Sequence, residues 1–434
     1  MERLMGGWKW AGTTVLSTAL LAASVAGSGG AAAVLGVPGH TNAFASIAAT
    51  RDLVVAGWAA TTPEGASDVY AAVSRDGGRK FAAPTRVTRA GGVNASGEQP
   101  VRVVLIPRVS GDPAVVIVWT ARSEAGTRLF SARSTDGGRS FGPQVLVPGT
   151  DAPGNRGWES VAASGDGTLA AVWLDHRGVV AATGVSGDSS HHDHLAAGQN
   201  KTDSVARAQL SQLLFGRLDG AAAPRPLASG VCYCCKTALA ADGGKGVYAA
   251  WRHVYTGNVR DIAFTRSTDG GRTFAAPVRV SQDNWVLDGC PENGPAIAAD
   301  RHGQVHVVWP TLVPGGTPDT PTLALFYARS ADGAHFTPRQ QIPTNGFPRH
   351  VQIVPGPGDA ITVAWDEQAP GSRRVAFARG TADAAGTVRF TRQPVADVAA
   401  AAYPILAAQG NDIVLGWTSG PTGHTTIEVT RLDK

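Results

Sequence analysis

The sequence predicts an all-β propeller of four-stranded blades, seven in number, with six as the alternative. Two internal repeats support this fold class. One is an eight-residue phrase that recurs along the chain, and the other is a short apolar strand that ends in tryptophan. A repeat of a few tens of residues is typical of architectures built from copies of one supersecondary unit. The prediction is therefore one repeating domain instead of several domains in a chain of 434 residues.

The eight-residue phrase has the pattern Ser-x-Asp-Gly-Gly-x-x-Phe. It occurs at Ser74–Phe81, Ser134–Phe141 and Ser267–Phe274, with a degenerate copy at Ser330–Phe336. Each copy lies between two short apolar runs. Aspartate can accept hydrogen bonds from backbone amides of a turn, and glycine supplies positive φ at little cost. The phrase therefore predicts a hairpin turn between two strands.

The tryptophan strands mark one strand in every blade. They end at Trp58, Trp119, Trp173, Trp251, Trp309, Trp365 and Trp417. Their separations of about 50 to 80 residues suit one four-stranded blade each. The last unit has room for only three strands, so the run from Ala31 to Val37 is expected to complete it and close the ring.

The repeated phrase resembles the Asp-box, or BNR repeat, of the sialidase superfamily. That resemblance implies a propeller in which the boxes lie on the blade rim, away from any active site. Sialidases have six blades, so a count of seven departs from the pattern of these enzymes. The resemblance of this phrase therefore indicates the fold and says little about the reaction.

The start of the chain has the features of an export signal. Residues 1–30 combine a basic beginning, an apolar run from Ala11 to Ala26 and small residues near its end, which is typical of a cleavable signal peptide. A single domain is expected over residues 31–434. We therefore expect a secreted or periplasmic protein with no membrane span. The net charge of +4 is dispersed, which disfavours a nucleic-acid partner. The oligomeric state cannot be inferred.

Propeller topology sorts the chain into two faces. Turns between third and fourth strands lie on one face, and the connections between blades lie on the other, which we call the box-free face. Most of the side chains that could catalyse a reaction or bind a ligand fall on the box-free face. An insertion at about 178–206, between two strands of the third blade, opens there as well and carries His191, His192 and His194.

The four cysteines occupy two loops that flank the fourth blade. They are Cys232, Cys234, Cys235 and Cys290. In an exported protein they could form disulfides, with Cys234 or Cys235 paired to Cys290. Alternatively, the thiolates could bind copper or zinc as a cofactor, together with the three insertion histidines.

The sialidase resemblance implies an arginine clamp for a carboxylate, a tyrosine nucleophile with a glutamate partner, and an acid. The first clamp arginine is missing from the matching region Asn42–Ile47. Candidates for substrate binding are Arg177, Arg252, Arg349 and His350. Candidates for catalysis are Tyr403, Glu159 and Asp175. The structural alternative is that Arg177 and Arg252 brace neighbouring blades and that Asp175 pairs with an arginine.

The sequence thus predicts a secreted sialidase-like propeller that recognises a glycan or similar polar ligand on its box-free face. If it is an enzyme, it resembles an exo-α-sialidase-like glycoside hydrolase. One alternative is a metal-binding exported propeller that uses the cysteines and the insertion histidines. The other is a non-catalytic platform for protein interaction, a common use of propellers.

Overall fold

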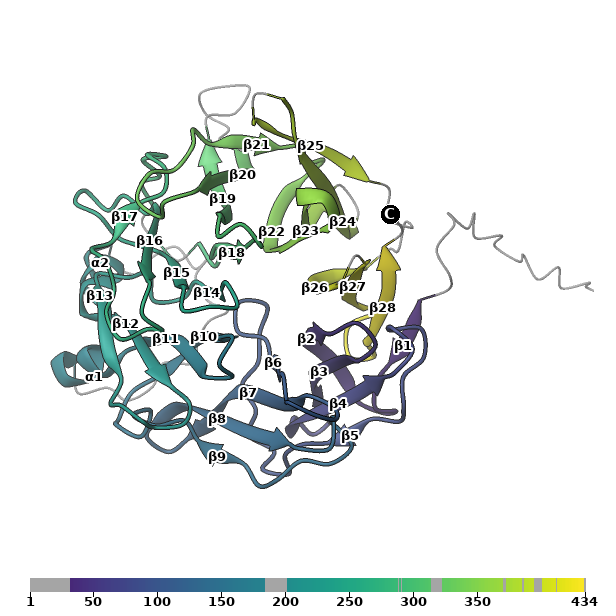
Figure 1. Cartoon of the computed structure of the whole chain (residues 1–434). Helices are drawn as coiled ribbons and strands as arrows, with labels where there is room; N and C mark the ends of the chain where they lie inside the picture. The colour runs from purple at the N-terminus through teal and green to yellow at the C-terminus, as the bar shows by residue number, and fades with distance from the viewer. Residues whose placement is uncertain are drawn as a thin grey trace, which may run out of the picture.

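The computed structural model describes residues 32–183, 201–287, 289, 291–313, 322–369, 372–384, 386–393, 400–410 and 412–432. Within these residues, 28 strands form seven four-stranded antiparallel sheets. The sheets are arranged as blades around a common axis, with the first strand of each blade innermost (Figure 1). The predicted seven-bladed propeller is confirmed, and the alternative of six blades is wrong.

The first three blades follow the chain in order from the innermost strand outward. Blade 1 comprises β2 (Thr41–Ala49), β3 (Val54–Thr61), β4 (Ser67–Ser74) and β5 (Thr85–Arg86). Blade 2 comprises β6 (Arg102–Ile106), β7 (Ala114–Ser123), β8 (Gly126–Ser134) and β9 (Val145–Leu146). Blade 3 comprises β10 (Arg156–Ala163), β11 (Leu169–Asp175), β12 (Gln212–Arg217) and β13 (Arg225–Ser229).

The next three blades repeat this order. Blade 4 comprises β14 (Ala238–Ala241), β15 (Val247–Arg252), β16 (Ile262–Ser267) and β17 (Val278–Arg279). Blade 5 comprises β18 (Ala296–Ala299), β19 (Val305–Val313), β20 (Thr322–Ser330) and β21 (Gln340–Ile342). Blade 6 comprises β22 (Phe347–Pro355), β23 (Ile361–Ala369), β24 (Ser372–Ala382) and β25 (Val388–Gln393), with a 3-10 turn at Pro357–Asp359.

Blade 7 joins the two ends of the described chain. It comprises β26 (Ala402–Gln409), β27 (Asp412–Ser419), β28 (Thr426–Leu432) and, on its outer edge, β1 (Ala33–Leu35). Strand β1 pairs antiparallel with β28, with Val34 opposite Glu428. The ring is therefore closed by a strand from the N-terminal part of the chain, as the missing fourth strand of the last unit predicts.

Asn42 fastens this closure. Its side chain accepts hydrogen bonds from the Val37 amide at 2.8 Å and from the Trp58 indole at 2.9 Å, and donates to Thr425 O at 3.0 Å. The segment after β1, the first blade and the last blade therefore meet at one buried amide, which is 2% exposed. Its donors and acceptors are satisfied by hydrogen bonds, as burial of a polar group requires.

The core of the protein lies between the blades. Each of the seven repeated tryptophans is in the second strand of its blade and is buried. Seven apolar clusters link each blade to the next around the ring, such as the one that joins Val55 and Val73 of blade 1 to Ile117 and Trp119 of blade 2. Because each blade buries its faces against its neighbours, its strands are apolar on both sides.

The repeated phrase connects the third strand to the fourth in four blades, as three full copies and the degenerate copy of blade 5. In the first copy, the Ser74 hydroxyl donates to Asp76 Oδ1 at 2.8 Å and accepts from the Gly78 amide at 2.8 Å. Asp76 Oδ1 also accepts from the Lys80 amide at 2.9 Å. Gly77 and Gly78 have φ of 76° and 88°, a region that glycine occupies without strain. The resemblance of this phrase to the Asp-box rests on its sequence alone.

The described helices belong to the insertion in blade 3. α1 (Arg177–Thr183) and α2 (Lys201–Leu210) both lie between β11 and β12. Neither of these helices has the length and apolar character that a membrane crossing would require.

We expect Asn42→Ala to lower the free energy of unfolding by about 2–4 kcal/mol, because it leaves several buried backbone and indole groups without partners. Urea denaturation followed by tryptophan fluorescence measures this change. The exposed Asn345 provides a control, since Asn345→Ala should alter stability by less than about 0.5 kcal/mol. Equal effects of the two substitutions would contradict a closing role for Asn42.

Candidate functional site

Seven equivalent positions surround the axis where the innermost strands begin. In each blade, the residue before the repeated tryptophan pairs with a residue of the innermost strand, and the equivalent position lies two residues before that partner. We call these seven positions the axial ring. They are Phe44, Pro100, Trp158, Lys236, Gly294, His350 and Tyr403. Because strands alternate in direction, the ring lies on the box-free face.

Four members of the axial ring share an unusual backbone conformation. Phe44, Trp158, His350 and Tyr403 have φ of 56°, 54°, 51° and 54°. Each lies within a register shift of its innermost strand. Positive φ costs a bulky residue of the order of 1–3 kcal/mol, and such strain is concentrated at functional sites. Three of these rings meet, because Tyr403 contacts both Phe44 and His350, whereas Trp158 packs in the apolar cluster between blades 3 and 4.

A loop that enters blade 2 crosses the axial ring. We call Asn94–Gln99 the axial loop, and Figure 1 shows it as the segment that reaches inward ahead of β6. The Trp158 amide of blade 3 donates to Gln99 Oε1 at 3.0 Å. The amides of Lys236 and Gly294, from blades 4 and 5, donate to Glu98 Oε2 at 2.9 and 2.8 Å. One short loop therefore holds three other blades.

The same loop reaches blades 6 and 7 through Gly97. A Cβ atom at this position would lie 2.4 Å from Tyr403 Cε1 and 2.5 Å from His350 Nε2. Only glycine allows this close approach without a shift of the loop or the rings. Gly97 therefore covers the Nε2 side of His350, which is 8% exposed.

His350 and Asp366 form a buried dyad on blade 6. His350 Nδ1 lies 2.9 Å from Asp366 Oδ2, and Asp366 is fully buried. Arg373 Nη2 also lies 3.0 Å from Nδ1, so both charged neighbours contact this nitrogen, and Nε2 is the ring nitrogen that remains for another molecule. A carboxylate that orients an imidazole in this way is the arrangement used for general acid–base chemistry.

Arg373 and Tyr403 complete the cluster. Arg373 Nη2 donates to Asp366 Oδ1 at 3.0 Å, and its guanidinium lies 4.9 Å from the centre of the Tyr403 ring. Tyr403 also contacts His350 and Phe44 edge-on, with ring centres 4.7 and 4.9 Å apart. Arg373 and Tyr403 keep part of their surface in solvent. The cluster thus presents a cation and aromatic edges on the box-free face.

Asp366 is the electrostatic centre of the cluster. Burial would raise its pKa, but the charges of His350 and Arg373, the His350 hydrogen bond and the 2.7 Å bond from the Tyr403 amide outweigh burial and hold the pKa below its usual value. Burial alone would lower the pKa of Arg373, and the Asp366 charge instead raises it. Both groups are therefore ionised at neutral pH.

The other predicted catalytic residues lie elsewhere. Glu159 is fully buried, accepts from the Thr120 hydroxyl at 3.0 Å and has a pKa raised by burial. Asp175 is also buried, and Arg156 and Arg177 bind it at 3.1 and 2.7 Å. Burial would raise the pKa of Asp175, but these arginines lower it. The structure does not join either carboxylate to Tyr403 by a hydrogen bond among the described residues.

The predicted substrate arginines have different surroundings. Arg252 is 1% exposed and donates to the carbonyls of Asn293, Arg260 and Pro310, which matches the bracing alternative. Arg177 is partly exposed but bound to Asp175 and to Gly149 O. Arg349 is exposed beside His350 on β22. Of the residues predicted for catalysis and substrate binding, the structure brings His350 into contact with Tyr403 and Arg177 into contact with Asp175.

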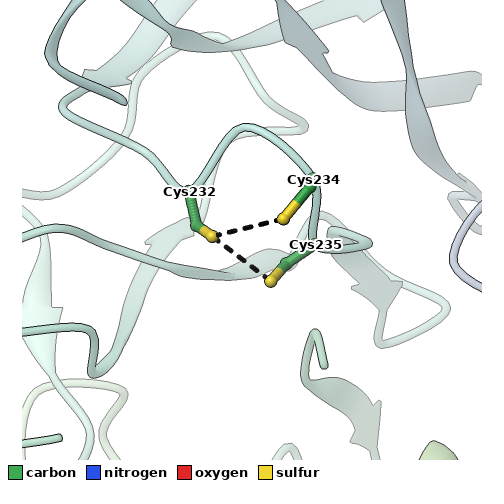
Figure 2. Close-up of side chains that lie close together, drawn as sticks. All are labelled: Cys232, Cys234 and Cys235. Atoms are coloured by element: carbon green, nitrogen blue, oxygen red, sulfur yellow. Dashed lines mark hydrogen bonds between the residues drawn. The ribbon is translucent and has the colours of Figure 1, made fainter. Parts of the chain in front are cut away.

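Three cysteines meet in the turn that precedes β14 (Figure 2). The sulfur of Cys232 lies 3.3 Å from that of Cys235 and 3.8 Å from that of Cys234, and Cys232 and Cys235 are free thiols. Burial would raise the pKa of Cys232, but the Cys235 thiol and the guanidiniums of Arg260 and Arg252 lower it to about 6. Cys290 and the histidines at 191, 192 and 194 lie outside the described residues, so the predicted pairing with Cys290 and the histidine ligands stay predictions.

Three residues of the cluster around Tyr403 are not among the predicted site residues, although the sequence places one of them, Asp366, on the box-free face. Asp366 follows the Trp365 strand on the expected face, which is a usable signal. Arg373 starts the next strand, and a hairpin of this length on the box-free face places it next to Asp366. Gly97 gave no signal, because its contacts depend on blades 6 and 7, about 250 to 300 residues later.

Searches for similar proteins found structural likeness only. No protein-family model matches the chain, and no protein in a search of curated sequences matches it. An α-L-arabinofuranosidase from Fusarium graminearum has 13% identity and a TM-score of 0.51, over 94% of this chain and 98% of that chain. An ulvan lyase has 9% identity and a TM-score of 0.54, over 92% and 94%.

A third solved structure extends the same comparison. An α-L-arabinanase from Penicillium chrysogenum, bound to arabinobiose, has 13% identity and a TM-score of 0.50, over 93% and 98% of the two chains. Two sialidases are also similar, at TM-scores of 0.48 and 0.42. The chain therefore shares its propeller fold with the arabinofuranosidase, the ulvan lyase and the arabinanase. At these identities the likeness concerns fold alone.

We expect Asp366→Asn to lower the free energy of unfolding at pH 7 by about 3 kcal/mol, because it leaves Arg373 without its buried partner. The folded pKa of Asp366 is depressed, so its stabilising effect is present above about pH 4 and is lost as pH falls through the folded value. The gap between wild type and variant should therefore narrow below about pH 4. Chemical denaturation at several pH values measures it.

The exposed Asp52 provides the matched control. Asp52→Asn should change stability by less than about 0.5 kcal/mol at each pH. A gap for Asp366→Asn that stays constant down to pH 3 would contradict the ionised, paired state of this carboxyl.

Proposed function

We propose that this protein binds a glycan that carries a carboxylate at the cluster of Phe44, His350, Asp366, Arg373 and Tyr403, and that it cleaves this glycan. The observation that carries the proposal is the partly exposed Arg373, which lies over the Tyr403 ring and is held in place by buried Asp366. The fold likeness to arabinofuranosidase, arabinanase and ulvan lyase structures supports a glycan as the ligand class.

Arg373 suits a carboxylate ligand. One of its nitrogens is used by Asp366, and 28% of its side chain remains exposed. A guanidinium can form two parallel hydrogen bonds with a carboxylate, which gives strength and orientation together. Tyr403 and Phe44 add aromatic surface with which the apolar face of a sugar ring can pack. Exposed Arg349 and Phe347 lie on the same strand as His350 and extend this surface.

His350 is the group we propose for proton transfer. Asp366 fixes the ring through Nδ1, so Nε2 is the proton-exchanging atom. Gly97 lies over Nε2, and a substrate therefore requires a shift of the axial loop to reach it. Tyr403 lies against the same ring and offers a phenol as a second proton-transfer group.

The sialidase activity that the sequence suggests is a narrower proposal. It requires three arginines around one carboxylate, and the predicted set of Arg177, Arg252 and Arg349 includes one residue whose guanidinium is occupied by backbone carbonyls. Arg373 with Arg349 supplies two candidates on one blade. We therefore propose a carboxylated glycan as the ligand class, with a sialoside as one member to test.

Export is also a proposal. Residues 1–30 have the pattern of a signal peptide, and an extracellular location would give access to polymeric glycans. The intact mass of the protein recovered from its host measures whether this segment is removed, and a mass that includes it would contradict export by cleavage.

We expect Arg373→Ala to weaken binding of an acidic oligosaccharide about 10- to 100-fold, the loss of one or two charge-assisted hydrogen bonds. Calorimetric titration with sialyllactose, oligogalacturonides and arabino-oligosaccharides measures this. Arg139→Ala, on the opposite face and 61% exposed at its side chain, is the control and should bind as wild type does. Equal affinities for all three proteins would contradict the site, and binding of only the neutral oligosaccharides would contradict the carboxylate.

We expect His350→Gln to reduce kcat on the oligosaccharide that binds by about 10²- to 10⁴-fold, while its affinity changes little, because proton transfer is lost and Arg373 remains. Chromatography of the products over time measures kcat. An unchanged kcat would exclude His350 as the proton-transfer group. Absence of any turnover by wild type would leave a binding protein.

A further inference from the structure

The cysteine turn carries a second inference, independent of the glycan site. The turn from Val231 to Thr237 is fixed at both ends. The Cys232 amide donates to Arg252 O at 2.9 Å, and the Thr237 amide donates to Trp158 O at 3.0 Å. Between these bonds the Lys236 amide is held by Glu98. The positions of the sulfurs are therefore set by the backbone before any ligand binds.

The sulfurs are close enough to share one ion. Cys232 and Cys235 are the two free thiols of the turn, and their sulfur atoms and that of Cys234 lie within 4.8 Å of one another (Figure 2). Metal–thiolate bonds are about 2.3 Å long, so two sulfurs on one ion are at most about 4.6 Å apart. Cys232 and Cys235, now 3.3 Å apart, need only a small opening of their side chains to bind an ion.

The charges around the pair are positive. Arg260 is fully buried, and its Nη1 donates to the Cys232 sulfur at 3.4 Å. Its Nη2 is buried without a hydrogen-bond partner. Arg252 is buried next to it and stacks on Trp285 at 4.8 Å. Neither guanidinium forms an ion pair with a carboxylate of the described residues. A buried cation without a counter-charge is costly, so these guanidiniums favour negative charge on the Cys232 sulfur. Burial and the neighbouring Cys232 instead raise the pKa of Cys235.

The sulfur ligands and the nearby guanidiniums together indicate which class of metal ion would bind. The ligand group within the described residues contains sulfur only, and soft thiolates prefer Cu(I) and Zn. A structural zinc site uses four ligands. Two thiolates with a monovalent ion form an anionic complex, which offsets a guanidinium, whereas a divalent ion would give a neutral one. A disulfide between Cys232 and Cys235 would likewise be neutral and would leave both cations uncompensated.

We propose that Cys232 and Cys235 bind one monovalent soft metal ion of the Cu(I) class, as an anionic two-thiolate complex beside Arg260 and Arg252. Burial excludes water and competing ligands, since both cysteines are 2% exposed or less. Ala208 of α2 and Val254 pack on the turn, and the Arg207 guanidinium lies 5.1 Å from the Tyr233 ring. α2 therefore covers the site.

Anaerobic titration of the exported protein, reduced with a phosphine, tests the proposal. Cu(I) is supplied as its complex with a coloured chelator, and uptake is measured from the loss of colour and from native mass. We expect one Cu(I) for each chain and a higher midpoint of thermal unfolding with Cu(I). Zn(II) should produce neither effect. Failure of the wild type to take up Cu(I), or preference for Zn(II), would overturn the proposal.

Variants distinguish the contribution of the two cysteine ligands to Cu(I) binding from that of the neighbouring arginine. Cys232→Ser and Cys235→Ser should each weaken Cu(I) binding at least 100-fold, with thermal unfolding of the metal-free variants as the check that they fold. Arg260→Met keeps both thiols and should weaken Cu(I) binding about 10-fold through lost charge compensation. Peptide mapping of the wild type must find both thiols reduced or metal-protected. A persistent Cys232–Cys235 disulfide, or full Cu(I) affinity in either serine variant, would overturn the proposal.

Discussion

The cluster around Tyr403 and the cysteine turn both depend on the hydrogen bonds that the Glu98 carboxylate accepts. This carboxylate is carried by the loop that enters blade 2, yet it binds the amides of Lys236 in blade 4 and Gly294 in blade 5. This bond fixes Gly97 against His350 and Tyr403, and it also fixes the backbone next to Cys235. Both hydrogen bonds are to one buried carboxylate oxygen, so one residue connects the cluster around Tyr403 to the cysteine turn.

The repeated blade supplies the position of each site, and individual residues supply the chemistry. Every innermost strand begins at an equivalent point around the axis, and at four of these points the strand bulges and the residue takes positive φ. The bulge is the same in each case, but the side chains differ: phenyl, indole, imidazole and phenol. His350 and Tyr403 have charged neighbours at this position because blade 6 adds Asp366 and Arg373 beside them.

The fold could be predicted in detail because it is repetitive. The Trp strands give the second strand of every blade, and the short final unit gives the closure by β1. For the site, the sequence indicates the face of the propeller but not which residues meet there. Topology shows at which end of a strand Arg252 lies, but not that three carbonyls from neighbouring blades enclose its guanidinium. Gly97, Asp366 and Arg373 meet Tyr403 only because bulges and a crossing loop bring distant segments together.

The central claim is that a glycan binds at the cluster on the box-free face. Hydrogen–deuterium exchange of the purified protein, with and without an excess of oligogalacturonides or sialyllactose, tests it directly. The account predicts slower exchange in peptides that cover the axial loop and residues 347–352, 372–376 and 401–405, with the box turns unchanged. Protection confined to the box turns, or to the blade edges, would contradict it.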